Sequence, residues 1–445
     1  MPGADSPPLP AAPTYKSRAF AWFWWARVLS TLAVQAESAT IGWQVYTIAR
    51  DTRTVEESAF LVGMVGLAQF VPLFALTFLA GATADRCDRR AILLVCTGVE
   101  IVCAVVLATF SLDPNPSLAP VFVVAVLFGA SRAFLSPASG AMGPMLVSRD
   151  ALPRAISRNS LGDQIGAVIG PWVGGVLCAV SPAAAYGGSA ALYALAVVAL
   201  LAVRANTRPE HQPGSRLELI REGIVYVWTN KVVLGAISLD LFTVLLGGAT
   251  ALLPVYASDV LQVGADGFGI LRSGPAVGAA VMACALAWRP LRHRAGRWMF
   301  AGVAAFGAAT LVFAVSESLV VSVVALATLG AADMISVYVR QSLVQVVTPD
   351  AMRGRVSAVS GLFIGASAEL GEFETGVAAR ILGPVGAAIF GGIGSLAVAG
   401  AWFWMFPSLR KADRLDGTET CKSEQGESQE GPQKGTKSES VAIVS

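Results

Sequence analysis

Twelve long apolar stretches follow one another along this chain, and each is long enough to cross a lipid bilayer as a helix, which takes about 20 residues. Their approximate bounds are 19–48, 58–84, 91–111, 119–146, 156–180, 184–204, 231–259, 267–290, 297–316, 319–346, 355–379 and 385–407. Backbone groups in lipid must be satisfied within the protein, and the stretches lack the alternation of membrane β-strands. The sequence therefore predicts an all-α integral membrane protein with the bilayer as its surroundings.

The composition supports this class and excludes several others. The chain is 55% hydrophobic and 14% charged, whereas about 25% of the residues of a soluble domain are charged. A net charge of +2, with no basic run that includes aromatic residues, gives no indication of a nucleic-acid partner. Six cysteines without metal-ligand spacing, two histidines and no Walker-type glycine loop predict no metal site, no cofactor and no enzyme activity.

The distribution of arginines predicts the orientation in the membrane. If both termini are cytoplasmic, the inner loops hold most arginines, with clusters at 86–90 and 289–297. The outer loops then hold little beyond Arg50, Arg53 and Arg380. This asymmetry obeys the positive-inside rule only for an even number of helices with both ends inside.

The longest polar connection, 205–230, divides the twelve stretches into six and six. The predicted parts are a disordered N-terminal arm (1–17), a first bundle (18–204), a cytoplasmic linker (205–230), a second bundle (231–410) and a disordered tail (411–445). "VSRDALPRAIS" (147–157) aligns with "VTPDAMRGRVS" (347–357) at an offset of 200 residues. Duplicated halves place a binding site between them near the middle of the bilayer.

The loop "GATADRCDRR" (81–90) joins the second and third stretches. Its notable residues are Gly81, Asp85, Arg86, Arg89 and Arg90. It can be read as an ordinary positive-inside turn, but it also resembles the signature loop of the major facilitator superfamily. That resemblance implies a cytoplasmic gating loop whose acidic residue and arginines latch the two halves together. The chain departs from the pattern at Asp88, where many members have glycine.

A glycine-rich segment, "GAVIGPWVGG" (166–175), lies in the fifth stretch. Gly166, Gly170 and Gly174 recur every four residues and predict a flat face for a neighbouring helix, while Pro171 predicts a bend. The segment, which ends at Gly175, is similar to the glycine-proline motif of proton-coupled exporters in the superfamily. Close packing alone is the alternative interpretation.

The second half narrows the resemblance. Residues 330–376, together with 26–46 and 132–144, resemble the branch of the superfamily that includes the enterobactin exporter and related drug efflux proteins. The resemblance covers approximately residues 18–407. It implies the major facilitator fold, with twelve transmembrane helices in two pseudo-symmetric six-helix bundles, and a siderophore or drug-like substrate.

Several ionisable residues fall well inside the predicted helices, where each costs about 2.5–3.5 kcal/mol to insert and is functional by default. The proton-coupling or cavity-lining candidates are Glu37, Arg132, Asp240, Asp333, Arg340, Glu369 and Glu372. Glu37 is the first candidate for the proton, with Arg132 as its predicted partner, so that protonation would break the pair and shift the conformation. Asp240 is the second candidate. Arg27 and Asp163 lie nearer the cytoplasmic ends.

The segment "SAELGEFETG" (367–376) is unusual because it carries three glutamates within an apolar helix. Glu369 and Glu372 are three residues apart and share a helix face. We expect them to face the cavity, where they would bind a cationic or hydrogen-bonding substrate or carry a proton; packing and local salt bridges are the alternative. Asp333 and Arg340 share a face but lie about 10 Å apart along the axis, so we expect partners on other helices.

The functional prediction is a monomeric secondary active exporter of the bacterial inner membrane. It would move a small amphipathic molecule, a siderophore or a drug-like compound, outward in exchange for protons. Two alternatives remain open, because a fold does not fix direction: uptake or facilitated passage of a metabolite, and a membrane sensor on a transporter scaffold. Substitution of Glu37 and Glu369 by glutamine would separate a carrier from a scaffold.

Overall fold

A computed structural model describes residues 18–205, 207–208, 216–291 and 293–412. The predicted N-terminal arm lies outside the described residues, and so does the predicted tail apart from residues 411 and 412. The described part of the chain is helical and contains no β-strand, which confirms the predicted fold class.

The first half contains six long helices. They are α1 (Arg18–Arg50), α2 (Val55–Arg86), α3 (Arg89–Phe110), α4 (Ala119–Met145), α5 (Leu152–Val180) and α6 (Pro182–Ala202), with the short 3-10 helix η1 (Arg149–Ala151) before α5. Polar side chains fix several starts: Thr54, Asp88 and Ser181 accept hydrogen bonds from backbone N–H groups in the first turns of α2, α3 and α6. α1 packs on α5 and α6, and α4 packs on α2 and α3.

The second half begins after the linker. Its elements are α7 (Arg216–Thr229), α8 (Lys231–Leu246), η2 (Ala249–Leu252), α9 (Leu253–Val255), η3 (Tyr256–Val260), α10 (Gly264–Trp288), α11 (Ala295–Ala314), α12 (Leu319–Val347), α13 (Asp350–Met405) and α14 (Pro407–Lys411). α13 is interrupted at Gly383, which has a φ of 75° and precedes Pro384. Glycine tolerates this left-handed conformation, and the interruption falls between the last two predicted spans.

The described helices account for the predicted spans. Ten of them are long and apolar enough to cross a membrane, and one of the ten is α13, which contains two predicted spans. The remaining predicted span is α1, which is more polar but has 33 residues. The chain is therefore a multi-pass membrane protein.

The two halves meet through two equivalent pairs of helices. α2 packs against α13 and α5 packs against α10, so the second long helix of each half contacts the fifth of the other. A Cβ added to Gly63 would lie 2.7 Å from the Cα of Gly376, and one added to Gly175 would lie 2.6 Å from the Cα of Gly269. Each helix pair thus crosses at a pair of glycines, which is the arrangement expected of a pseudo-twofold fold.

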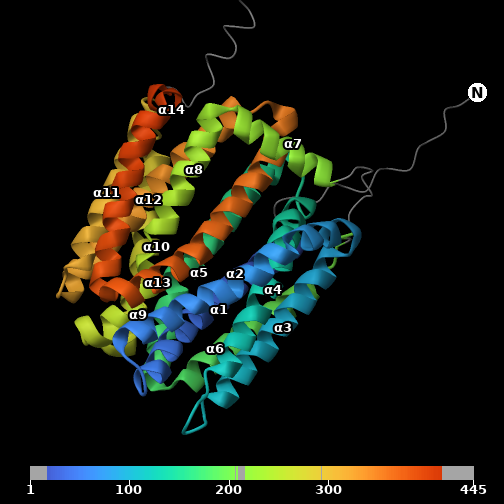
Figure 1. The fold of residues 1–445 in the computed structure, drawn as a ribbon. Coiled ribbons are helices and arrows are strands. Elements are labelled where there is room, and N and C mark those ends of the chain that lie inside the picture. Colours follow the sequence, from blue (N-terminus) through green and yellow to red (C-terminus); the bar gives the residue numbers. More distant parts are fainter. Residues whose placement is uncertain (1–17, 206, 209–215, 292, 413–445) are drawn as a thin grey trace, which may run out of the picture.

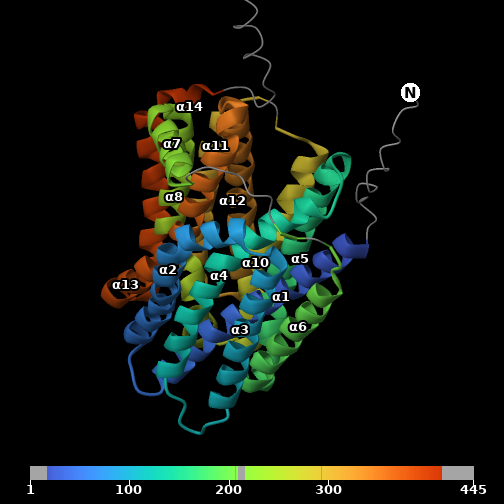
Figure 2. The same cartoon turned by 90° about the vertical axis from the view of Figure 1, so that its right-hand side faces the viewer.

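The halves are joined at the end of the molecule that carries α9, called here the α9 end. Arg50 of α1 forms an ion pair with Asp259 of η3 at 3.0 Å. The Trp43 ring stacks on Phe268 with centroids 5.5 Å apart. Figure 1 shows the two groups of helices diverging from this end towards α7, and Figure 2 shows α7, α8, α11 and α12 on one side and α1, α3 and α6 on the other.

The linker helix α7 packs on the second half. Val227 belongs to an apolar cluster with Val233 of α8 and Val356 of α13. The hydroxyl of Tyr226 donates to the carbonyl of Val347 at 3.0 Å. These contacts attach the helical part of the predicted linker to the second bundle, while the predicted domain boundaries remain predictions.

Candidate transport site

An arginine and a glutamate connect the two halves at the centre of the molecule. Nη1 of Arg132, on α4, donates to Oε1 of Glu369, on α13, at 2.7 Å. The same nitrogen lies 3.3 Å from Oε1 of Gln69, on α2. Glu369 is only 8% exposed. The Arg132 side chain is 39% exposed, so the contact is only partly buried. A short, charge-assisted hydrogen bond of this kind is nevertheless among the stronger polar contacts in a protein.

A second arginine accompanies the second glutamate. Nη2 of Arg272, on α10, lies 3.7 Å from Oε1 of Glu372. Its Nη1 donates to the carbonyl of Thr250 at 3.2 Å. Arg272 was not among the predicted site residues, although an arginine inside the predicted span 267–290 is the same signal that identified the other candidates.

Gln69, Arg132, Arg272, Glu369 and Glu372 are called here the central charge network. Its two glutamates lie on one face of α13, as their spacing predicted, and each has its own arginine. The repulsion expected between the two carboxylates is therefore compensated by two guanidinium groups. Glu369 pairs with an arginine of the first half and Glu372 with an arginine of the second half. The two glutamates can therefore form salt bridges and also take part in a contact between the halves.

A glycine lets α2 approach this network. A Cβ added to Gly66 would lie 2.8 Å from the carbonyl oxygen of Glu369 and 2.9 Å from the Cβ of Glu372. Any larger residue would push α2 away from the turn that carries both glutamates. The position of Gln69, one turn further along α2, depends on this close approach.

A cavity between the halves lies beside the network. Val62, Val65 and Phe268 provide apolar wall, and Arg272 and Glu372 provide charge. Apolar walls with a few convergent polar groups are typical of small-molecule sites. In this conformation the cavity has a volume of about 20 Å³, which is room for about one water molecule, so the halves must move apart here before a larger molecule can enter.

The predicted pair between Glu37 and Arg132 is wrong. Glu37 is fully buried, and its Oε2 accepts a hydrogen bond from the Tyr193 hydroxyl of α6 at 2.9 Å. Arg132 binds Glu369 of the other half instead. Both residues lie within long helices, Glu37 in α1 and Arg132 in α4, but the rotation of α1 directs Glu37 towards α6.

In the second half, the first and fourth long helices, α8 and α12, are joined by a charged pair of the kind predicted between α1 and α4. Nη2 of Arg340, on α12, lies 3.5 Å from Oδ2 of Asp240, on α8, and both side chains are at least 95% buried. Nη1 of Arg340 also donates to the Ser360 hydroxyl at 3.2 Å. Arg340 and Asp333 do not pair directly, as their spacing predicted. Within the part of the chain that the structure describes, the carboxylate of Asp333 has no hydrogen bond or ion pair.

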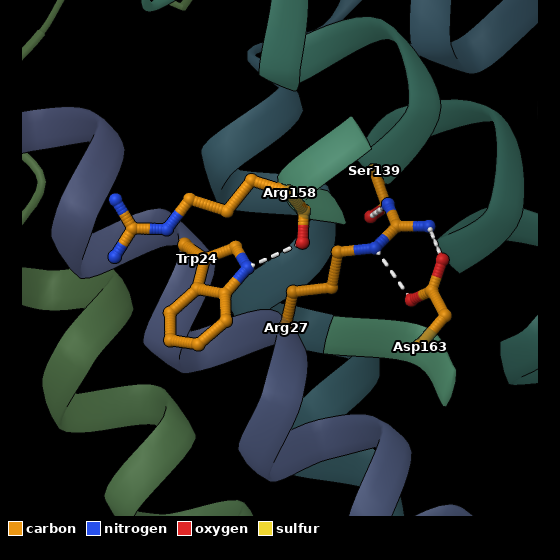
Figure 3. A network of polar contacts seen from close by, with 5 residues as sticks. All are labelled: Trp24, Arg27, Ser139, Arg158 and Asp163. Carbon is orange, nitrogen blue, oxygen red and sulfur yellow. Dashed lines mark hydrogen bonds and ion pairs between the residues drawn. The ribbon is translucent and has the colours of Figure 1, made fainter. Parts of the chain in front are cut away.

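Arg27 and Asp163 pair with each other near the start of α1 (Figure 3). Nε and Nη2 of Arg27 donate to the two carboxylate oxygens of Asp163 at 2.8 and 2.7 Å, and Nη1 donates to the Ser139 hydroxyl at 2.8 Å. Beside them, the Trp24 indole donates to the carbonyl of Arg158 at 2.7 Å. These contacts tie α1, α4 and α5 together within the first half.

Two arginines of the 81–90 loop, Arg89 and Arg90, also bind within the first half. Arg89 donates to the carbonyl of Ala141 at 3.1 Å, at the end of α4. Arg90 donates to the carbonyls of Leu200 and Leu201 at the end of α6, at 2.9 and 2.7 Å. Asp88, which departs from the family pattern, caps α3 and accepts a hydrogen bond from Thr207. The arginines therefore satisfy carbonyls at helix C-termini in this conformation, and a latch between the halves remains a prediction.

The glycines of α5 form a packing face, as their spacing predicted. Cβ atoms added to Gly166, Gly170 and Gly174 would lie 2.6 Å from atoms of α1. Gly175 instead faces α10 of the other half. These contacts describe close packing, and the export-type role of the motif is not tested by them.

No group of three or more histidine, cysteine or acidic side chains is placed to bind a metal ion in the described ranges. The central polar groups instead form arginine–carboxylate pairs beside the cavity. When a carboxylate in such a pair takes up a proton, or a bound molecule takes its place beside the arginine, the contact between the two halves is broken. Contacts that open in this way can link binding to movement of the halves.

A family model described as transmembrane secretion effector matches residues 10–430, and the chain belongs to this family of the major facilitator superfamily. It is therefore a transporter, and transporters of this kind are not enzymes.

Among individual relatives, the chain is 27% identical over 374 residues to the enterobactin exporter of Escherichia coli O1:K1, covering 83% of this chain and 84% of that protein. It is equally similar, over 372 residues, to the enterobactin exporter of Shigella boydii serotype 18, with the same two coverages.

Solved structures confirm the fold. A peptide transporter superposes with a TM-score of 0.70 at 14% identity, covering 90% of this chain and 97% of that chain. A bacterial homologue of the lysosomal transporter Spinster, in an inward-facing and occupied conformation, gives a TM-score of 0.68 at 13% identity, covering 89% and 97%. These identities bear on the fold alone.

Proposed function

We propose that the chain is a secondary active exporter of the bacterial inner membrane, which moves a small amphipathic compound outward in exchange for protons. The observation that carries the proposal is the contact between Arg132 of one half and Glu369 of the other. The similarity to enterobactin exporters supports a siderophore or a drug-like compound as cargo. Both termini are then cytoplasmic, and the α9 end faces outward.

The proposed coupling uses the central charge network. With Glu369 ionised, its ion pair with Arg132 holds α13 against α4 and occupies the guanidinium. A proton on Glu369 removes the charge that Arg132 binds, so the guanidinium becomes available for acceptor groups of the cargo. Proton and cargo thus act on the same contact between the halves. Each would bind more tightly to the state in which the Arg132–Glu369 pair is open than to the state in which it is closed, and coupling requires such a difference.

The residues that line the cavity support an amphipathic cargo, which the cavity would admit only after opening from its present volume of about 20 Å³. Val62, Val65 and Phe268 would contact its apolar part, while Arg272 and Glu372 would contact its polar groups. Because Glu372 has Arg272 as its own partner, a cargo group that binds Arg272 must compete with a carboxylate 3.7 Å away. Such competition favours cargo with hydrogen-bond acceptors.

The test uses inside-out vesicles with an acidic interior and a pH-sensitive dye. Siderophores and cationic or neutral drugs are added singly to vesicles with the parent chain, Glu369→Gln, or Glu57→Gln, a control at an exposed glutamate of α2. We expect cargo-triggered loss of protons from the interior with the parent and the control, and none with Glu369→Gln. Passage of labelled cargo into the parent vesicles without proton movement would refute proton coupling.

A further inference from the structure

Two glutamates are sealed inside the first half, away from the central cavity. Glu37 of α1 and Glu100 of α3 are both 0% exposed. Tyr193 of α6 and Ser131 of α4 contact them. Glu100 was missed from the sequence, although it lies in the middle of the span 91–111 and met the same criterion as the residues that were chosen.

Neither carboxyl group is fully satisfied. Oε2 of Glu37 accepts from the Tyr193 hydroxyl at 2.9 Å, and Oε1 of Glu100 lies 3.4 Å from the Ser131 hydroxyl. The other oxygens, Oε1 of Glu37 and Oε2 of Glu100, are buried and have no hydrogen-bond partner. Within the described residues, no arginine or lysine forms an ion pair with either glutamate.

This environment suits a neutral acid and not a carboxylate. An ionised carboxyl group that is buried without a cation carries a large desolvation cost, whereas the neutral acid carries a much smaller one. Two negative charges in one enclosed region would add repulsion. The other ionisable groups that act on the pair are Tyr186 and Tyr193 of α6, Cys96 and Cys103 of α3, and Arg132 of α4.

We propose that Glu37 and Glu100 together form a proton-binding site within the first half, separate from the cargo cavity. In the conformation described here both carboxyl groups hold a proton. Release requires the half to repack so that water or a cation reaches the unpaired oxygens. This proposal rests on the proposed function in one respect: the transport cycle is what would drive the repacking.

Helix α4 provides a physical connection to the cavity. Ser131, which contacts Glu100, directly precedes Arg132, which binds Glu369. Adjacent residues of a helix point about 100° apart, so α4 touches both sites. The Ser131–Glu100 contact is long for a hydrogen bond between oxygens, which usually spans about 2.7–2.8 Å. A small rotation of α4 when the Arg132–Glu369 pair opens would therefore break it.

The first test is infrared spectroscopy of the purified chain in lipid. A protonated carboxyl group has a C=O stretch that shifts in deuterated water and that glutamine lacks. We expect Glu100→Gln and Glu37→Gln each to remove part of this band, and Ser131→Ala to shift the Glu100 part. Glu57→Gln, at an exposed position, leaves the band unchanged. A band that Glu100→Gln leaves intact in a folded protein overturns the proposal.

The second test counts the protons that move with each cargo molecule in vesicles. We expect Glu100→Gln to lower the ratio of protons to cargo, because glutamine fixes that position in its neutral form. If Glu100→Gln changes neither the ratio of protons to cargo nor the dependence of transport on pH, Glu100 is a packing residue and its proton-carrying role is overturned. If the parent chain moves cargo without protons, the proposed coupling fails, and the infrared band alone decides whether the pair holds protons.

Discussion

The substitution Gly63→Ala should raise the population of molecules in which the two halves are apart at the α9 end. Gly63 of α2 lies against Gly376 of α13, and an added Cβ would be 2.7 Å from the Cα of Gly376 and 2.8 Å from the carbonyl oxygen of Glu372. Carbon atoms normally approach to about 3.5–4.0 Å, so the helices must separate by roughly 1 Å. Both neighbouring atoms belong to the backbone and cannot rotate away.

The size of the effect follows from the cost of overpacking. An extra methyl group in a close contact costs about 1–3 kcal/mol. This cost applies only while α2 and α13 are in contact, because the added methyl group meets nothing once the halves part. An energy of about 1–3 kcal/mol corresponds to a shift of roughly 5- to 150-fold in the ratio of two states. We therefore expect the population with an open α9 end to rise by that factor.

The assay measures the distance between spin labels across the α9 end. Cysteines at Thr52 and Asp266, both exposed and on opposite halves, would carry the labels after the native cysteines are replaced. Gly98→Ala on α3 is the matched control, because a Cβ there meets nothing within 4 Å. We expect a longer distance to gain population in Gly63→Ala only. Equal distance distributions in both variants would refute the view that this glycine contact sets the closed state.

Three other substitutions test separate contacts. Asp259→Asn weakens the partly exposed ion pair with Arg50, which is worth up to about 1 kcal/mol, so the same spin labels should report a few-fold larger population with an open α9 end; an unchanged population would assign the closure to the other contacts. Asp240→Asn leaves Arg340 buried without its partner, and we expect a loss of roughly 3–5 kcal/mol of stability, measured as a lower thermal unfolding midpoint in detergent; an unchanged midpoint would contradict a stabilising pair. Arg27→Lys cannot reproduce the two-point contact with Asp163, and we expect reduced thermal stability with unchanged cargo selectivity; altered selectivity would move this pair into the transport site.

Much of the fold could be predicted from the sequence, because its causes are local. Long apolar runs must be helices in lipid, and the interruption between the last two spans coincides with Gly383 and Pro384. The spacing of Glu369 and Glu372 placed both on one helix face, and the glycine spacing in α5 placed three glycines on another. These properties depend on a helix's own period and not on its neighbours.

The partners of the buried charges depended on the tertiary structure. The sequence placed Glu37 and Arg132 at suitable depths but could not supply the rotation of α1 and α4 about their axes. That rotation is set by packing against all neighbours at once, and it turned Arg132 towards Glu369 of the other half. Arg272 and Glu100 were missed although depth alone could have marked them. The sequence by itself determined which residues lie within the long apolar helices. The packing of the described helices decided which of those residues meet, because contacts between distant segments depend on helix orientation that no local pattern encodes.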